Sequence, residues 1–243
     1  TQDILHRKFL GAYLGGSFAH GGWDANSDVD FCIVIDSDLT DNEIIELTSL
    51  HTKIFECGTY WGKHFEGAYF PKNILQDLDR TDIPIWYLDN GSLIFERSVH
   101  DNTLVNRWVL REHGIVLAGM PLRTWIPKIP EEKLKAEVYK TMVDWGNEIL
   151  QGIYLLDKRW AQAFAVLMYC RILHTLSTGE VHSKPDGVNW AKANLDRVWI
   201  GLIDDAVIAR QEQYIDITQP SDPEKVKATF AFIKYALAVS KHL

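Results

Sequence analysis

The sequence has little that would indicate a secreted protein, a membrane-spanning protein or a protein with a cysteine-based zinc site. Three cysteines, Cys32, Cys57 and Cys170, are spread over 243 residues. None is spaced as a CxxC pair, so neither a zinc site nor a disulfide framework is indicated, and we expect each to be a small buried apolar residue. The longest apolar run in the helical part, 163–170, is too short to cross a bilayer. No signal-peptide pattern opens the chain, so the expected location is the cytoplasm, with no membrane partner.

The chain also lacks an excess of positive charge. Its formal net charge is −8, so broad binding to nucleic-acid phosphates is not expected. Residues 1–128 carry 18 acidic and 11 basic side chains, whereas the remainder carries 15 and 14. An acidic first half suits bound divalent cations or a polycationic substrate, and a solvated acidic surface explains most of these charges equally well.

The first half has the pattern of an α/β domain. Short apolar runs bounded by turn residues predict strands, and apolar residues at helical spacing around Ile44 predict an amphipathic helix. Asp89-Asn90-Gly91 is the strongest short hairpin signal in the chain. The expected strands are Gly11–Gly15, Asp28–Ile35, His64–Phe70, Ile83–Leu88 and Leu93–Val99, followed by a helix at Asn102–His113.

The second half has the pattern of a helical bundle. Pro121 and Pro127 mark a linker, and Pro130 followed by two glutamates favours a helix start. The expected helices are Pro130–Leu156, Trp160–Ser177, Asp186–Leu195, Val198–Tyr214 and Pro223–Leu243. We therefore predict an α/β domain with a mixed sheet and flanking helices at residues 1–128, and an all-α helical bundle at residues 129–243.

One stretch between the first two strands combines features of a nucleotide-binding turn and a metal site. It begins at Gly15 and reads GGSFAHGGWDANSDVDF. Gly16 lets the backbone turn tightly and approach a ligand closely, and the hydroxyl of Ser17 adds a donor for terminal phosphates. Asp28 and Asp30 stand two apart at a strand start, so their carboxylates project from one face. Neighbouring carboxylates repel unless a cation lies between them, and hard oxygen ligands suit Mg²⁺.

In this order and spacing, the two halves of the stretch resemble the GS-x-DxD signature of the polymerase-β-like nucleotidyltransferase superfamily. That superfamily usually adds a third carboxylate from a neighbouring strand, and Glu66 is the best-placed candidate. The resemblance implies that Asp28, Asp30 and Glu66 are catalytic and metal-binding. Glu66 would share a second ion or act as the general base, for which partial burial would raise its pKa. Sequence signatures of P-loop, dinucleotide-binding, HExxH and GxSxG proteins are absent.

The rest of the chain narrows the resemblance. Two further segments resemble the aminoglycoside adenylyltransferases that modify streptomycin and spectinomycin. They are REHGIVLAG, which begins at Arg111, and LMYCRILHTLSTGEVHSKP, which begins at Leu167, and a proline-rich linker follows the first. In that family ATP, Mg²⁺ and drug meet in a cleft between the two domains. The resemblance implies that Gly16 and Ser17 bind the nucleotide together with Arg171 and Lys184, whose side chains are typical phosphate ligands.

Two further positions concern the acceptor. Trp86 aligns roughly with an aromatic residue that drug-modifying members use to contact their substrate, although a tryptophan in this apolar context is as often a core residue. Asp157 is the only acid in LDKRWAQ, where those members carry several acids against cationic groups. This departure leaves recognition of streptomycin and spectinomycin open, while the nucleotidyl-transfer residues are all present.

The sequence therefore predicts an enzyme, monomeric or homodimeric, that transfers AMP from ATP to a hydroxyl of a small molecule. An aminoglycoside or aminocyclitol antibiotic is the expected acceptor, which would make the chain an antibiotic-resistance protein. Two alternatives remain. One is adenylylation of a protein partner by an antitoxin-like transferase, and the other is a catalytically inactive nucleotide-binding relative. The large helical half disfavours the first, and the complete carboxylate set disfavours the second.

Overall fold

The structure is a computed structural model that describes residues 1–212 and 216–243. The chain forms two compact units. The first comprises Thr1–Trp23 and Ser27–Ile129, and the second comprises Pro130–Leu243 together with Asp24–Asn26. The predicted α/β class of the first half and the helical class of the second are confirmed. The predicted helix end at Tyr214 lies outside the described residues.

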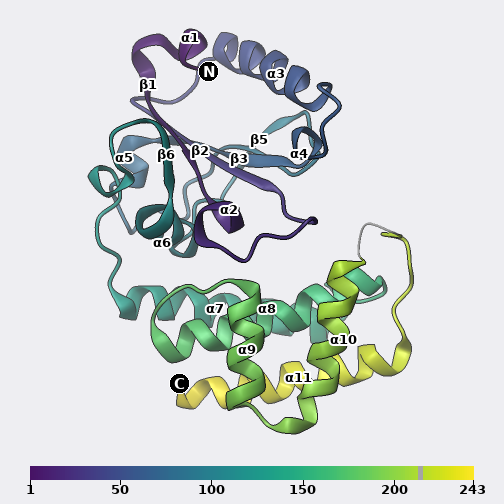
Figure 1. Cartoon of the computed structure of the whole chain (residues 1–243). Helices are drawn as coiled ribbons and strands as arrows, with labels where there is room; N and C mark the ends of the chain where they lie inside the picture. Colours follow the sequence, from purple (N-terminus) through teal and green to yellow (C-terminus); the bar gives the residue numbers. More distant parts are fainter. Residues whose placement is uncertain (213–215) are drawn as a thin grey trace. The chain divides into compact units, whose positions relative to one another are not determined.

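A six-stranded mixed sheet forms the centre of the first unit (Figure 1). Its order is β5-β4-β3-β2-β1-β6, in which β2 and β3 are parallel and the other neighbours are antiparallel. The edge strand β6 was not predicted, because its side chains are mostly exposed and its pairing with β1 joins segments a hundred residues apart. The strands are β1 (Phe9–Leu14), β2 (Val29–Ile35), β3 (Phe65–Pro71), β4 (Ile85–Leu88), β5 (Phe95–Ser98) and β6 (Ile115–Gly119).

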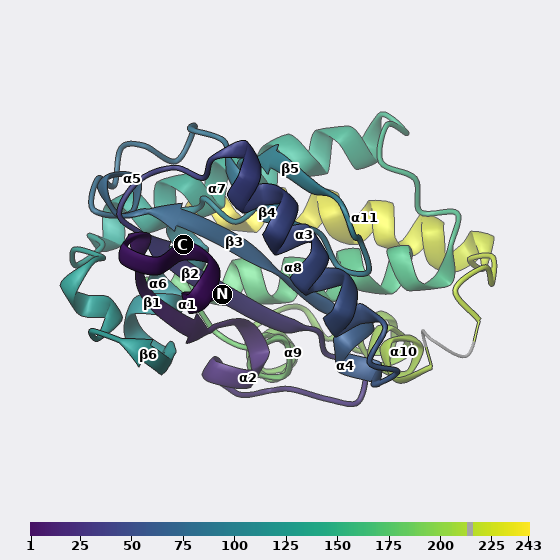
Figure 2. The same cartoon turned by 90° about the horizontal axis from the view of Figure 1, so that it is seen from above.

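Helices cover both faces of this sheet. On one face α3 (Asp41–Phe55) lies across the strands, as Figure 2 shows, and its Leu47 is fully buried against Phe31 and Tyr69. Thr40 and Glu43 start this helix with a complete capping box. On the other face lie α2 (Gly16–His20) and α6 (Leu104–His113) (Figure 1). Three one-turn helices complete the unit, α1 (Gln2–Leu5), α4 (Tyr60–Lys63) and α5 (Lys72–Leu75).

The second unit is built around α8 (Arg159–Thr178), whose side chains are mostly buried among the other helices. The prediction that the first helix runs to Leu156 was wrong, because α7 ends at Leu150. There Gly152 adopts a left-handed φ of 73°, and the N–H of Ile153 donates to Glu148, which closes the helix end. The surrounding helices are α7 (Glu131–Leu150), α9 (Lys184–Asn194), α10 (Ile200–Gln211) and α11 (Pro223–Val239).

The cysteine prediction needs one correction. Cys32 and Cys170 are buried as expected, but Cys57 is exposed in the turn that follows α3. Burial and the neighbouring Asp101 raise the pKa of the Cys32 thiol, whereas a hydrogen bond with Thr59 lowers that of Cys57. In the part of the chain that the structure describes, no helix is long and apolar enough to cross a membrane.

Candidate active site

The turn after β1 places the backbone of Gly16 directly against a carboxylate. Gly16 has a left-handed φ of 53°, and a Cβ there would lie 1.7 Å from Oδ2 of Asp30. Glycine is thus needed both for the backbone conformation and for space. The hydroxyl of Ser17, the next residue, is buried without a hydrogen-bond partner among the described residues. Buried polar groups are normally satisfied, so this hydroxyl suits a ligand oxygen such as that of a phosphate.

The three predicted carboxylates come together at one end of the sheet. Asp30 and Glu66 are direct neighbours in the parallel pairing of β2 and β3, so their side chains share a face. Asp28 lies just before β2, and its Oδ2 accepts a hydrogen bond of 3.2 Å from Nδ2 of Asn90. Asp28 also contributes to the raised pKa of Glu66. Carboxylates that gather in this way offer hard oxygen ligands to a divalent cation.

Glu66 lies in a largely buried environment, with its side chain 13% exposed. The hydroxyl of Tyr87 donates a hydrogen bond of 2.5 Å to Oε1, and Nε2 of His100 lies 3.6 Å from the same oxygen. Burial raises the pKa of the Glu66 carboxyl, the hydrogen bond from Tyr87 opposes this, and the negative charge of Asp28 adds to the increase. A carboxylate with a raised pKa is a better proton acceptor.

The hairpin of β4 and β5 decides which aromatic residue reaches Glu66. Tyr87 pairs with Ala68, which lies on the same face as Glu66. Trp86 pairs with Tyr69 on the opposite face, where it packs against the core below α3 and under the guanidinium of Arg97. The structure thus does not bring Trp86 to the carboxylates, and its role in substrate binding stays a prediction.

Four residues around Glu66 and Asp28 were not predicted, namely Tyr87, Asn90, His100 and Asp101. Tyr87 could have been found from strand alternation once the register with β3 was known. Asn90 was interpreted only as part of a turn. His100 and Asp101 follow β5 in a loop, and nothing in their local sequence indicates that they return to Glu66.

The two predicted phosphate ligands lie close together in the helical unit. Arg171 lies in α8, and its Nε donates a hydrogen bond of 2.6 Å to the carbonyl of His182, just ahead of α9. Lys184 begins α9, and its ammonium lies 5.6 Å from the ring centroid of Phe164. Phe164 and Arg171 are two turns apart and therefore share a face of α8. The close approach of Gly187 to the backbone of Arg171 joins the two helices.

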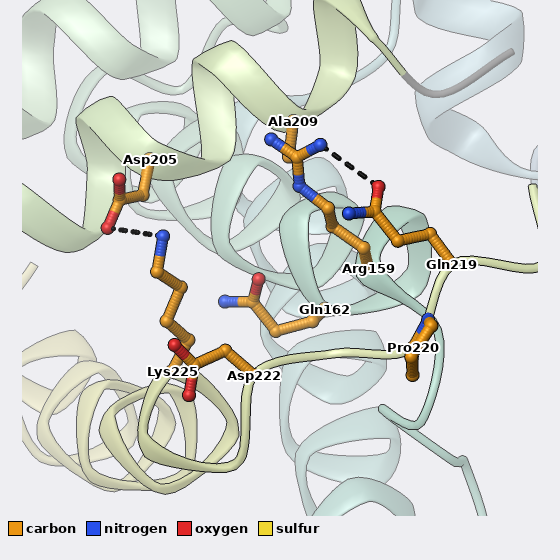
Figure 3. A pocket seen from close by; sticks show the side chains of 8 residues that line it. All are labelled: Arg159, Gln162, Asp205, Ala209, Gln219, Pro220, Asp222 and Lys225. Atoms are coloured by element: carbon orange, nitrogen blue, oxygen red, sulfur yellow. Dashed lines mark hydrogen bonds and ion pairs between the residues drawn. The ribbon is translucent and has the colours of Figure 1, made fainter. Parts of the chain in front are cut away.

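Asp157, by contrast, lies on the surface of the helical unit. Its side chain is 58% exposed and pairs with Lys158, while its carbonyl accepts from the N–H of Ser221. Beside this segment is a cavity of about 330 Å³, drawn in Figure 3, in whose lining Arg159, Asp205 and Lys225 form ion pairs within the unit. Arg159 contacts Gln219 and Glu212, and Lys225 contacts Asp205. None of the predicted site residues lines this cavity.

Comparisons with known proteins find matches for both halves of the chain. Residues 3–59 match the family model of the nucleotidyltransferase domain, and residues 124–236 match that of the aminoglycoside adenylyltransferase C-terminal domain. Spectinomycin 9-adenylyltransferases of Staphylococcus aureus, from strains Mu50 / ATCC 700699 and N315, are 22% identical over 258 residues, covering 99% of this chain and 92% of each relative.

A solved structure shares the fold. The spectinomycin adenyltransferase AAD(9) from Enterococcus faecialis, determined with ATP and spectinomycin, superimposes with a TM-score of 0.71 at 19% identity. The match covers 97% of this chain and 94% of that one. The two successive matches show that the chain joins a nucleotidyltransferase domain to an aminoglycoside adenylyltransferase C-terminal domain.

Proposed function

We propose that the protein transfers AMP from ATP to a hydroxyl of an aminoglycoside or aminocyclitol antibiotic, in a Mg²⁺-dependent reaction in the cytoplasm. The observation that carries the proposal is the meeting of Asp28, Asp30 and Glu66 beside the turn of Gly16 and Ser17. The spectinomycin 9-adenylyltransferase relatives support the choice of nucleotide and acceptor class.

The residues present fit a bound Mg²⁺. Asp28, Asp30 and Glu66 supply oxygen donors from one face of the sheet, and the negative charge of Asp28 helps to raise the pKa of Glu66, a repulsion that a cation would offset. When bound, the ion would offset the charge of the triphosphate and of the transition state. Asp28, Asp30 and Glu66 would hold that ion, and their negative charges would otherwise repel the phosphates.

The other predicted residues bind the triphosphate, and Glu66 serves the acceptor hydroxyl. Gly16 and Ser17 bind the β- and γ-phosphates, and Arg171 and Lys184 offset the charge of the departing pyrophosphate. The acceptor oxygen forms a bond with the α-phosphorus as the bond from that phosphorus to the bridging oxygen breaks. Glu66 takes the proton that the acceptor hydroxyl loses, which its raised pKa favours.

The acidic surroundings of Glu66 favour a cationic acceptor. Asp28 and Asp89 lie near enough to raise its pKa, and His100 is the only histidine paired with it among the described residues. An acceptor with amino or guanidino groups would be attracted to this region, and an anionic one would be repelled. Trp86 and Asp157 remain predicted acceptor contacts outside the carboxylate cluster.

Pyrophosphate release tests the proposal most directly. The protein would be assayed with ATP and Mg²⁺ across a panel of aminoglycosides and aminocyclitols, with Asp30→Asn as the blank. Release that depends on one compound and vanishes in the variant would establish the reaction and its acceptor. Binding of Mg-ATP without release across the panel would move the acceptor to another metabolite or a protein. Failure to bind nucleotide at all would refute nucleotidyl transfer.

The role of Glu66 has its own test. Glu66→Gln keeps the size of the side chain and removes the proton acceptor, so we expect kcat to fall by roughly a hundredfold or more while the Kd for Mg-ATP changes little. Isothermal titration and steady-state kinetics measure the two quantities separately. A variant with normal kcat and weakened ATP binding would show that Glu66 only helps to hold the nucleotide.

A further inference from the structure

The turn between β4 and β5 directs one half-buried side chain at the carboxylate of Asp28. Nδ2 of Asn90 donates a hydrogen bond of 3.2 Å to Oδ2 of Asp28, which lies just before β2. On the other side of the amide, Oδ1 of Asn90 lies 3.0 Å from Nδ1 of His64, which lies just before β3. The Asn90 side chain therefore connects the starts of two parallel strands that are far from it in the sequence.

The direction of these two hydrogen bonds follows from the groups involved. An ionised carboxylate only accepts hydrogen bonds, so the amide nitrogen of Asn90 faces Asp28. The amide oxygen then faces His64, and since this oxygen can only accept, Nδ1 of His64 carries the proton. The backbone carbonyl of His64 also accepts the N–H of Val29 at 2.8 Å. His64 is thus bonded both to Asn90 and to the residue that follows Asp28.

The turn itself does not depend on the amide group of Asn90. Oδ1 of Asp89 accepts the backbone N–H of Asn90 at 2.9 Å, and the carbonyl of Asp89 accepts the N–H of Ser92 at 2.9 Å. Asparagine is common in turns because its side chain bonds to nearby backbone groups. The amide of Asn90 bonds instead to two side chains outside the turn, so its contacts serve Asp28 rather than the hairpin.

We propose that Asn90 is a positioning residue for Mg²⁺, which holds the Asp28 carboxylate in the orientation that the ion needs, and that His64 in turn holds Asn90. The inference rests on the proposed function, because that function assigns Asp28 to the ion. Carboxylates that bind metals are themselves hydrogen-bonded, and loss of such a partner typically weakens metal binding by about tenfold to a hundredfold. An amide suits this task, since a cationic partner would offset the negative charge that attracts the ion.

Mn²⁺ in place of Mg²⁺ provides the probe, together with α,β-methylene ATP, a nucleotide that cannot transfer AMP. Electron paramagnetic resonance of the free ion measures the Kd of Mn²⁺ for the full-length protein. Asn90→Leu keeps the approximate size of the side chain and removes both polar groups, so we expect this Kd to rise by about tenfold or more, and Asn90→Ala should behave alike. The matched control is Ser92→Ala in the same turn, where the hydroxyl bonds with the backbone of Ile94, and it should keep the wild-type Kd.

His64 offers a rescue by a conservative variant. His64→Leu removes the donor to Asn90 and should also raise the Kd of Mn²⁺, whereas His64→Asn places an amide N–H near the position of Nδ1 and should recover most of that loss. The dependence of transfer on Mg²⁺ separates positioning from a structural role. For Asn90→Leu the half-saturating Mg²⁺ concentration should rise by about tenfold, while excess Mg²⁺ restores kcat. A structural role would instead lower the Tm without metal, and excess Mg²⁺ would not restore kcat.

The possible results distinguish the positioning role from the proposed function. Equal Kd values of Mn²⁺ for the wild type and Asn90→Leu would overturn the positioning role and leave the function standing. A rise of the same size in Ser92→Ala would also overturn it, because the whole turn would then be responsible. A wild type that binds no Mn²⁺ would count against both. A raised Kd in Asn90→Leu alone, without transfer to any acceptor, would support the positioning role and count against the proposed acceptor class.

Discussion

The pH dependence of stability should report on a histidine buried in the core of the first unit. His51 lies in α3, is 4% exposed and is surrounded by aromatic rings, among them Phe31 at 5.3 Å and Phe95 at 5.1 Å. Its Nε2 hydrogen-bonds with the hydroxyl of Tyr69, and its Nδ1 is buried with no partner among the residues that the structure describes. Burial lowers the pKa of His51 to about 4 from its ordinary 6.5.

The sign and size of the effect follow from these two pKa values. Between pH 4 and 6.5 the unfolded chain binds a proton that the folded chain excludes, so stability is fully present above pH 6.5 and falls as the pH drops. The free energy of unfolding should be lower at pH 5 than at pH 7 by about 2 kcal/mol from this residue alone. The loss should level off below pH 4, at about 3 kcal/mol.

Urea unfolding of the wild type and of His51→Gln at pH 5, 6, 7 and 8, followed by circular dichroism, measures the effect. Glutamine can still bond with Tyr69 but does not titrate, so all other ionisable groups cancel in the difference between the two proteins. If the two units unfold in separate transitions, the difference between the two proteins should change with pH only in the transition of the first unit. A difference in unfolding free energy that stays constant with pH would refute the assignment of His51 as a buried neutral histidine.

Three further predictions concern backbone space, a buried charge and thiol reactivity. Gly16→Ala should abolish transfer and lower the free energy of unfolding by about 1–3 kcal/mol, because a Cβ would clash with Asp30 and the positive φ would be strained. The control Gly201→Ala, in open space on α10, should be neutral or slightly stabilising. Transfer assays and urea unfolding of both variants measure these effects. Arg107→Met should lower the free energy of unfolding in urea by about 3 kcal/mol, because the fully buried guanidinium donates hydrogen bonds to Asn102 and to the carbonyls of Asp77 and Arg80. A decrease as small as that of the exposed control Arg123→Met would contradict this. A thiol reagent at neutral pH should modify Cys57 rapidly and reach Cys32 and Cys170 only on unfolding, which mass spectrometry can follow; equal rates would be inconsistent with their burial.

Much of the carboxylate arrangement was predictable because its determinants are local. Asp28 and Asp30 lie two residues apart at a strand start, and strand geometry alone directs their side chains to one face. The glycine turn precedes them in the same short stretch, although the structure shows that Gly16 makes room for Asp30 rather than only for a ligand. The helical second half was equally evident from its apolar periodicity. That periodicity continues past the true end of α7 at Leu150, and Gly152 was the residue in the sequence that indicated this end.

The tertiary structure alone decided what surrounds these residues. The register of β3 with β4 turns Tyr87 towards Glu66 and Trp86 away from it, and a shift of one residue would exchange them. β6 pairs with β1, and Asp101 lies near Glu66, although these residues are far apart in the chain. Side-chain periodicity within one segment does not predict such contacts. Local patterns follow from the geometry of one strand or helix, whereas contacts between distant segments depend on how all of the strands and helices pack together.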